Sequence, residues 1–254
     1  MTMNREEQML CRHLMDLAET CYRRDIPIFS DFLSLYEQSL FHQYVAGGLP
    51  PVDFCLDGGY EYAERKILAF EPAGAGYHIP ASFCALEILP LQAKFSEDLT
   101  HRDYLGALIH LGLDRSGIGD ILPMDKSCVV FCTAPAADLI CRELTRIRHT
   151  SVHCVRTDRE SFEYSPHFED IRGTVASVRL DSVLALAFSG SRSRLVGLIE
   201  GEKVFVNGRL VNSNAYRLSP GDVVSVRGFG KFIYQQEVSQ TKKGRYLILI
   251  QKFI

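Results

Sequence analysis

A short run of small, polar and basic residues in the last third of the chain has the composition of an anion-binding site. Ser191 would place a capping hydroxyl at a helix start, where free backbone amides and the positive end of the helix dipole favour phosphate. Arg192 and Arg194 would stand in the same first turn, where positive charge weakens a helix. A helix that accepts this cost is expected to use both guanidinium groups on an anion.

The residues that follow extend this basic surface. Gly201 is expected to end the helix, and Asn207-Gly208 is a strong signal for a β-hairpin turn. Such a hairpin would present Lys203, Asn207 and Arg209 close to the helix start. Because the basic residues fall at consecutive element edges and not along one helix stripe, they favour a specific polyanion site over a solvated basic face.

The distribution of charge supports this interpretation. The whole chain of 254 residues has a formal net charge of −3. Residues 171–254 hold 13 Lys and Arg against 5 Asp and Glu, a net of +8, whereas residues 1–170 hold 15 against 26, a net of −11. A basic module on an acidic body indicates nucleic acid as the polyanion, since phosphate neutralisation supplies much of nucleic-acid affinity.

Composition excludes several other classes of protein. No stretch approaches the roughly 18 apolar residues of a membrane span, and the charged N-terminus lacks the apolar centre of a secretory signal. We therefore expect a cytoplasmic protein with no membrane partner. The eight cysteines are scattered without the two-residue spacing of a zinc knuckle, so neither a metal nor a disulfide framework is expected. No cofactor loop and no small-molecule site are evident.

The elements that would position the basic residues follow from apolar periodicity. The N-terminal segment predicts a helix with Leu10, Leu14, Leu17 and Cys21 on one face, and a second helix capped by Asp31. The middle segment predicts the order strand, helix, strand, strand, helix, strand, which is the ferredoxin-like split motif of RNA-recognition motifs and of many enzymes. The last segment predicts two helices, from Leu180 and from Ser191, followed by short antiparallel strands.

These elements define an α+β chain with three domains. A mixed helical N-terminal domain is expected over residues 1–74 and a ferredoxin-like domain over 75–157. A polar linker over 158–172 would precede the basic module at 173–254.

Three segments of the basic module resemble a known family. RLDSVLA, SRSRLVGLIEGEKVFVNGRLV and LSPGDVVSVRG are similar to the small RNA-binding domain named after ribosomal protein S-four. In that domain two helices and a hairpin grip structured RNA. The resemblance implies that the RNA-facing positions are Arg179, Ser191, Arg192, Ser193, Arg194, Lys203, Asn207 and Arg209. It implies a framework role for Asp181, Gly201, Gly208, Gly221 and Asp222.

Upstream segments extend the resemblance to most of the chain. GGYEYAERK, HRDYLGALIHLGLDRSGIGDI and VSVRGFGKF are similar to segments of the bacterial YlmH family, whose members place an S-four-type domain behind a ferredoxin-like domain. The resemblance implies binding to ribosomal RNA and tRNA on the large ribosomal subunit during the rescue of stalled translation. In the last of these segments, Arg227 and Lys231 are added to the expected RNA contacts.

Two alternatives stay open. Arg179-Leu180-Asp181 mimics the catalytic triplet of pseudouridine synthases, so an RNA-modifying enzyme is conceivable, although Asp181 would open a helix of the RNA-binding domain itself. A cell-division adaptor would need an exposed apolar patch on the N-terminal helices. We expect a non-enzymatic protein, in which case the middle domain should lack a pocket of convergent titratable groups.

Overall fold

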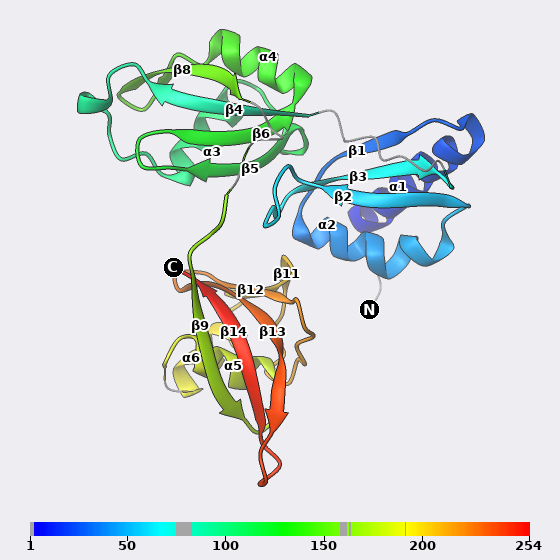
Figure 1. The fold of residues 1–254 in the computed structure, drawn as a ribbon, viewed down its shortest axis with the longest axis vertical. Helices are drawn as coiled ribbons and strands as arrows, with labels where there is room; N and C mark the ends of the chain where they lie inside the picture. Colours follow the sequence, from blue (N-terminus) through cyan, green and yellow to red (C-terminus); the bar gives the residue numbers. More distant parts are fainter. Residues whose placement is uncertain (1–2, 75–82, 158–161, 163, 191) are drawn as a thin grey trace. The chain divides into compact units, whose positions relative to one another are not determined.

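The computed structural model describes residues 3–74, 83–157, 162, 164–190 and 192–254 (Figure 1). The chain divides into two compact units, Met1–Tyr164 and Ser165–Ile254. Each unit is considered separately below.

The first part of unit 1 is a three-stranded antiparallel sheet in the order β1-β3-β2 with α1 packed against it. Its elements are α1 (Arg5–Arg24), β1 (Ile28–Leu33), α2 (Leu35–Leu40), the π-helix η1 (Phe41–Val45), the 3-10 turn η2 (Ala46–Gly48), β2 (Val52–Asp57) and β3 (Lys66–Pro72). The expected face of α1 is buried at Leu14 and Cys21, which pack with Phe41, Leu68 and Phe70 in one core.

The second helix does not begin where the sequence pattern placed it. Residues around Asp31 form β1, and α2 starts after Ser34, whose side chain caps the helix together with Glu37 in a reciprocal capping box. Pairing of β1 with β3 overrides the helical spacing of the apolar residues there.

The second part of unit 1 has the ferredoxin-like arrangement that the sequence predicts. Its elements are β4 (Phe83–Pro90), η3 (Ala93–Phe95), α3 (His101–His110), η4 (Arg115–Gly117), β5 (Ile118–Pro123), β6 (Cys128–Thr133), α4 (Ala134–Glu143), β7 (Arg146–Ile147) and β8 (Thr150–Thr157). The antiparallel sheet has the order β5-β6-β4-β8-β7, in which β6 lies between the two strands joined by α3. Only the short β7 adds to the expected motif.

Each face of this second sheet has its own core. The helices α3 and α4 cover one face, where Leu108 and Ile140 pack on Leu86 and Val130. On the other face a smaller cluster joins residues of β4 and β6 to residues of β1 and β3. Its buried members are Phe32, Ile67, Phe83, Ala85, Val129 and Phe131.

Unit 2 is a six-stranded antiparallel sheet with two helices on one face (Figure 1). Its elements are β9 (Phe168–Val175), α5 (Leu180–Ala187), α6 (Arg192–Glu200), β10 (Val204–Val206), β11 (Arg209–Leu210), β12 (Val223–Val226), β13 (Gly230–Gln240) and β14 (Tyr246–Phe253). The strand order is β11-β10-β12-β13-β14-β9. Leu184, Leu195, Val224, Phe232 and Ile250 are among the buried residues between helices and sheet.

One strand of this sheet was expected to be linker. Residues from Phe168 onward form β9, which pairs along its whole length with β14, so the connection is shorter than the predicted 158–172. The other predicted boundaries, near residues 74 and 157, stay predictions. The helices and strands expected from Leu180 to the C-terminal end lie within a few residues of their predicted positions.

Candidate nucleic-acid interface

The start of α6 carries the residues that first indicated an anion site. Ser191 lies outside the described residues; Arg192 and Ser193 belong to α6, but their side chains lie outside the described part. Arg194 is exposed, and its guanidinium carbon lies 5.3 Å from the centroid of the Phe229 ring. This distance is that of a cation–π contact. The aromatic ring therefore holds an exposed cation at the beginning of the helix.

Three more of the predicted contacts lie around the turn between β12 and β13. The carbonyl of Lys203 accepts a hydrogen bond of 2.9 Å from the backbone amide of Arg227, and both side chains are exposed. The guanidinium carbon of Arg227 lies 4.9 Å from the ring centroid of Phe205. The ammonium of Lys231 lies 4.3 Å from the ring centroid of Phe253. We call the four basic residues the turn cluster: Arg194, Lys203, Arg227 and Lys231.

Arg179 and Arg209 make their contacts elsewhere in unit 2. Arg179 immediately precedes α5 and donates two hydrogen bonds of 3.2 Å to the buried carboxylate of Asp181. Arg209 lies on β11, at the hairpin end of β10. Burial and the Asp222 carboxylate raise the pKa of Tyr216, and the charge of Arg209 opposes this shift. Both arginines thus lie near Tyr216, whose carbonyl accepts a hydrogen bond of 2.8 Å from the backbone amide of Leu180.

The amide of Asn207 is engaged inside the domain. Its nitrogen donates to Asp222 at 2.8 Å, and its oxygen accepts from the backbone amide of Val223 at 2.9 Å. Its φ of 49° allows the tight turn with Gly208. Asn207 therefore fixes the hairpin against the β12 start, and its role as an RNA contact stays a prediction.

The geometry of Asp181 fits a framework role. Its carboxylate is buried, accepts from Arg179 and Ser182, and lies in the first turn of α5. A buried carboxylate that neutralises an adjacent guanidinium has the geometry of a structural ion pair.

The described aromatic rings on the face of the middle sheet opposite the helices are covered by other parts of unit 1. RNA-recognition motifs stack bases on aromatic residues of the sheet face opposite the helices. In this chain Phe131 on β6 is fully buried there, stacked under Tyr60 at 5.5 Å and in edge contact with Phe162 at 5.3 Å. Phe83 of β4 packs edge-on against Phe32 of β1. Since Phe131 and Phe83 are covered by other parts of unit 1, these two rings are not available to stack bases in this arrangement.

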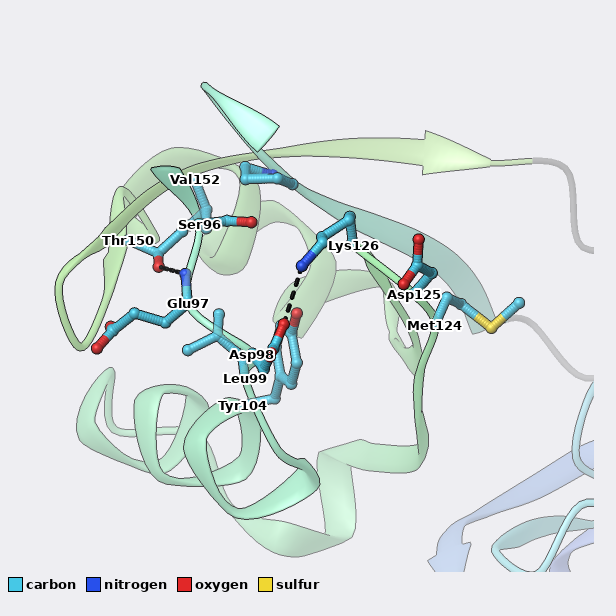
Figure 2. A pocket seen from close by; sticks show the side chains of 11 residues that line it. Ser96, Glu97, Asp98, Leu99, Tyr104, Met124, Asp125, Lys126, Thr150 and Val152 are labelled. Carbon is cyan, nitrogen blue, oxygen red and sulfur yellow. Dashed lines mark hydrogen bonds and ion pairs between the residues drawn. The ribbon is translucent and has the colours of Figure 1, made fainter. Parts of the chain in front are cut away.

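A pocket of about 360 Å³ lies at one end of the middle sheet (Figure 2). It is lined by Pro90, Ser96, Glu97, Asp98, Leu99, Tyr104, Met124, Asp125, Lys126, Thr150 and Val152. The non-enzymatic hypothesis predicts that the middle domain lacks a pocket with convergent titratable groups. This expectation is wrong in its simple form, because three carboxylates and a lysine line the pocket.

The pKa shifts in this pocket do not resemble those of an acid–base pair. Figure 2 shows the Lys126 ammonium directed at Asp98, and the two are 2.9 Å apart. Their hydrogen bond and mutual charge lower the pKa of Asp98 and raise that of Lys126. Burial raises the pKa of Tyr104 to about 12. All three shifts lead away from neutrality, whereas an efficient general acid or base has its pKa near the working pH.

Other kinds of site find no support among the described residues. In that part of the chain no three His, Cys, Asp or Glu side chains are placed to hold a metal ion. All eight cysteines are free, and burial raises the pKa of Cys132 and of Cys154 to about 12, so neither is an activated thiolate. No helix in the described ranges is long and apolar enough to cross a membrane.

The aromatic partners of the basic residues were not among the predicted site residues. Phe205, Phe229 and Phe253 each lie under a cation of the turn cluster. The sequence contains a signal for one of them, Phe229, since the segment RGFGKF interleaves basic, glycine and aromatic residues over Arg227–Phe232. Interleaved basic and aromatic residues are typical of nucleic-acid surfaces.

Comparison with known proteins gives matches in both units. Residues 84–161 match the family described as "Putative RNA-binding domain in YlmH", and residues 178–224 match the S4 domain. The chain is 28% identical over 227 residues to the "Ribosome-associated protein quality control protein P2" of Bacillus subtilis (strain 168), covering 88% of this chain and 86% of that protein.

Two shorter or more distant similarities accompany these matches. Fifty residues, 19% of this chain, are 46% identical to the small ribosomal subunit protein uS4 of Chromohalobacter salexigens and cover 24% of that protein. The solved structure described as "Cell division protein ylmH from Streptococcus pneumoniae" is 20% identical, with a TM-score of 0.48 over 62% of this chain and 94% of that one. The matches confirm the similarity to the YlmH family, with its RNA-binding domain at residues 84–161 and an S-four-type domain at residues 178–224.

Proposed function

We propose that this protein is a non-catalytic, cytoplasmic RNA-binding protein that contacts ribosomal RNA and tRNA on the large ribosomal subunit during the rescue of stalled translation. The S-four-type domain supplies the main contact with structured RNA. The acidic unit 1 restricts where that domain can bind and offers a surface to proteins.

The turn cluster is the observation that carries this proposal. Four basic side chains from α6, β13 and the segments that flank β10 and β12 surround one turn, and three of them rest on aromatic rings. Cations held in place by aromatic rings around one turn can contact several RNA phosphates in a fixed arrangement.

The comparisons support the same proposal. Both matched domains are RNA-binding domains in their descriptions or family, and the Bacillus subtilis relative is named for ribosome-associated quality control. Similarity to that relative extends over nearly nine-tenths of this chain, so both units take part in the comparison.

A double variant tests the site. Arg192→Ala with Arg194→Ala removes the two cations at the start of α6, and we expect weaker co-sedimentation with large ribosomal subunits. The slope of log affinity against log salt should decrease by about two phosphate contacts. Sucrose-gradient sedimentation at stepped salt concentrations gives both quantities.

Lys242→Ala with Lys243→Ala is the matched control, because it removes the same charge from the exposed β13–β14 turn. A much smaller loss is expected there. Equal losses in the two double variants would show diffuse attraction in place of a site. Unchanged sedimentation and salt slope in the Arg192/Arg194 variant would contradict the proposal.

The absence of catalysis has its own test. In the described part of the chain, the Asp98–Lys126 pocket and Asp181 are candidate places for an RNA-modifying activity. If the protein is non-catalytic, ribosomal RNA and tRNA from cells without it should carry the same modified nucleosides as wild-type RNA. Mass spectrometry of digested RNA measures this, and one missing modification that returns with the gene would favour the enzyme.

The adaptor alternative receives little support from the N-terminal helices. Met9 and Tyr22 are the large apolar side chains most exposed on α1, at 61% and 55%. They are 13 positions apart, about 20 Å along the helix axis. Single exposed apolar residues at this spacing do not form the contiguous patch that a protein-docking face needs.

A further inference from the structure

The face of the unit 2 sheet opposite α5 and α6 carries a row of side chains that crosses four strands. Along β10, β12 and β13 the inward positions are buried in the core, so the alternate positions point to the other face. Phe205 pairs with Ser225, and Ser225 pairs with Lys231. Residues directly opposite in antiparallel strands share a face, so these three side chains form one row. Phe253 of β14 lies under the Lys231 ammonium and continues it.

The middle of this row is hollow. A depression of about 440 Å³ is lined by Phe205, Ser225, Val226, Arg227, Gly230, Lys231, Phe253 and Ile254. The small side chain of Ser225 and the missing side chain of Gly230 leave space between the two phenylalanine rings. The volume falls within the range of about 300–1,000 Å³ found for sites that bind small organic groups.

Positively charged side chains lie at the rim of the depression. Arg227 lies over the Phe205 ring and Lys231 over the Phe253 ring, so each aromatic wall has a cation beside it. Among the described residues that line it, none is Asp or Glu. The nearest row of the sheet contains Asp170, which accepts a hydrogen bond of 3.0 Å from Gln251. The depression is thus apolar at its walls and positive at its rim.

We propose that this depression binds an unpaired nucleobase of RNA, with the base against Phe205 or Phe253 and the neighbouring phosphates on Arg227 and Lys231. Aromatic walls with adjacent cations are how proteins bind single-stranded nucleic acid, because every base has a stacking face and every nucleotide a phosphate. The inference rests on the proposed RNA-binding function and deepens it. In this proposal the start of α6 contacts structured RNA, and the sheet face opposite α5 and α6 binds a base that is unpaired and lies outside the RNA helix.

Short RNAs of two kinds test this site. A fluorescent oligouridine octamer serves as the single-stranded probe, and a fully paired RNA duplex of equal charge serves as the reference. We expect Phe205→Ala and Phe253→Ala each to weaken octamer binding by about 5- to 150-fold, the range of one base stack, with the salt slope unchanged. Duplex binding should stay the same, and Phe205→Tyr and Phe253→Tyr should keep the octamer affinity.

Controls separate binding from folding. Val238→Ala changes an exposed apolar residue of β13 outside the depression and should leave both affinities unchanged. Cross-linking of a 4-thiouridine octamer to the wild-type protein adds a measurement without any substitution, and Phe205 or Phe253 should carry the adduct.

The outcomes distinguish the two levels of the proposal. Wild-type protein that binds neither RNA contradicts the proposed function. Wild-type protein that binds the duplex alone, or alanine variants that bind the octamer normally, contradict only the nucleobase site. If those variants keep both RNA affinities but lose a protein that co-purifies with ribosomes, the depression is a protein-docking surface and the inference is wrong.

Discussion

At the scale of single residues, a carboxylate that accepts several hydrogen bonds organises each unit. Asp181 accepts two hydrogen bonds from Arg179 and one from Ser182, and only 4% of its side chain is exposed. Arg179 is 39% exposed, so part of its guanidinium faces solvent. One arginine therefore satisfies a buried charge and keeps an accessible face, which explains how a predicted RNA contact can also belong to the framework.

The Arg179–Asp181 pair makes a stability prediction. Asp181→Ala removes the buried partner and should lower the free energy of unfolding by about 1–3 kcal/mol, because solvent screens the half-exposed guanidinium that remains. Urea denaturation of the full chain measures this loss. Asp181→Asn keeps the side-chain volume and one acceptor, so its loss should be smaller. The folded Asp181→Asn variant should keep its RNA affinity. If Asp181 were catalytic, the same substitution would abolish an RNA modification even in a fully stable protein.

Asp120 has the corresponding role in unit 1. One of its oxygens accepts from the Tyr60 hydroxyl and the Glu64 amide at 2.7 Å each, and the other accepts from the Arg65 amide at 3.0 Å. Arg65 continues the network to the backbone of η4. Burial, followed by the Asp120 charge and its hydrogen bond, raises the pKa of Tyr60 far above its ordinary value of 10.0.

This shift predicts a loss of stability at alkaline pH. Folded Tyr60 keeps its proton where the unfolded chain releases it, so the folded state binds more protons and its stability falls as pH rises through about 10 and above. Tyr60→Phe should lose about 1 kcal/mol at pH 8 with its hydrogen bond, and then decline less steeply. Urea midpoints at pH 8 and pH 11 measure both effects. Parallel declines in the two proteins would contradict the assignment.

At the scale of elements, sequence patterns predict the helices and strands whose formation depends on residues close in sequence. The α5–α6 pair, the hairpin and the ferredoxin-like order follow from apolar periodicity, capping residues and Asn-Gly signals, and the structure confirms them. The basic side chains are found where these elements end. What the patterns cannot show is which ring a cation rests on, because Phe205 and Phe253 meet Arg227 and Lys231 through pairing of distant strands.

Two of the strands that were not predicted, β1 and β9, were missed for identifiable reasons. In β1 the apolar residues Phe29, Phe32 and Leu33 have helical spacing, because a register shift between Phe29 and Phe32 breaks the period of two. In β9 most residues are exposed or half-buried at the sheet edge, so no alternation marks the strand. Both segments form strands because they pair with strands distant in sequence, β1 with β3 and β9 with β14.

Substitutions at Asn207 can show whether this residue only stabilises the hairpin or also contacts RNA directly. Asn207→Ala places alanine, which disfavours the left-handed region, at a φ of 49° and removes two side-chain hydrogen bonds. The free energy of unfolding should therefore fall by about 2–4 kcal/mol. Asn207→Gly restores the backbone freedom and should recover about 1–2 kcal/mol of this. If Asn207 serves the hairpin alone, folded Asn207→Gly protein binds RNA like wild type in the co-sedimentation assay. A lower affinity with unchanged stability would make the amide a direct contact.

At the scale of the whole molecule, the net charge and the hydrophobic clusters both differ between the two units, Met1–Tyr164 and Ser165–Ile254. Residues 1–164 contain 15 Lys and Arg against 24 Asp and Glu, a net of −9, and residues 165–254 contain 13 against 7, a net of +6. One hydrophobic cluster lies entirely in unit 2, and the other three lie entirely in unit 1. Since each described cluster draws its buried residues from one unit, each unit has the core that an independently folding domain requires.

Separate units should therefore fold and should differ in RNA binding. Fragments 1–164 and 165–254 are expected to show cooperative thermal unfolding on their own, followed by circular dichroism. Fragment 165–254 should bind ribosomal RNA with a salt slope close to that of the full chain, because the turn cluster lies within it. It should also bind more non-ribosomal RNA, because the net −9 of unit 1 no longer repels weak targets. If fragment 1–164 bound RNA as tightly as the whole chain, the acidic unit would be a principal contact and this division of roles would be wrong.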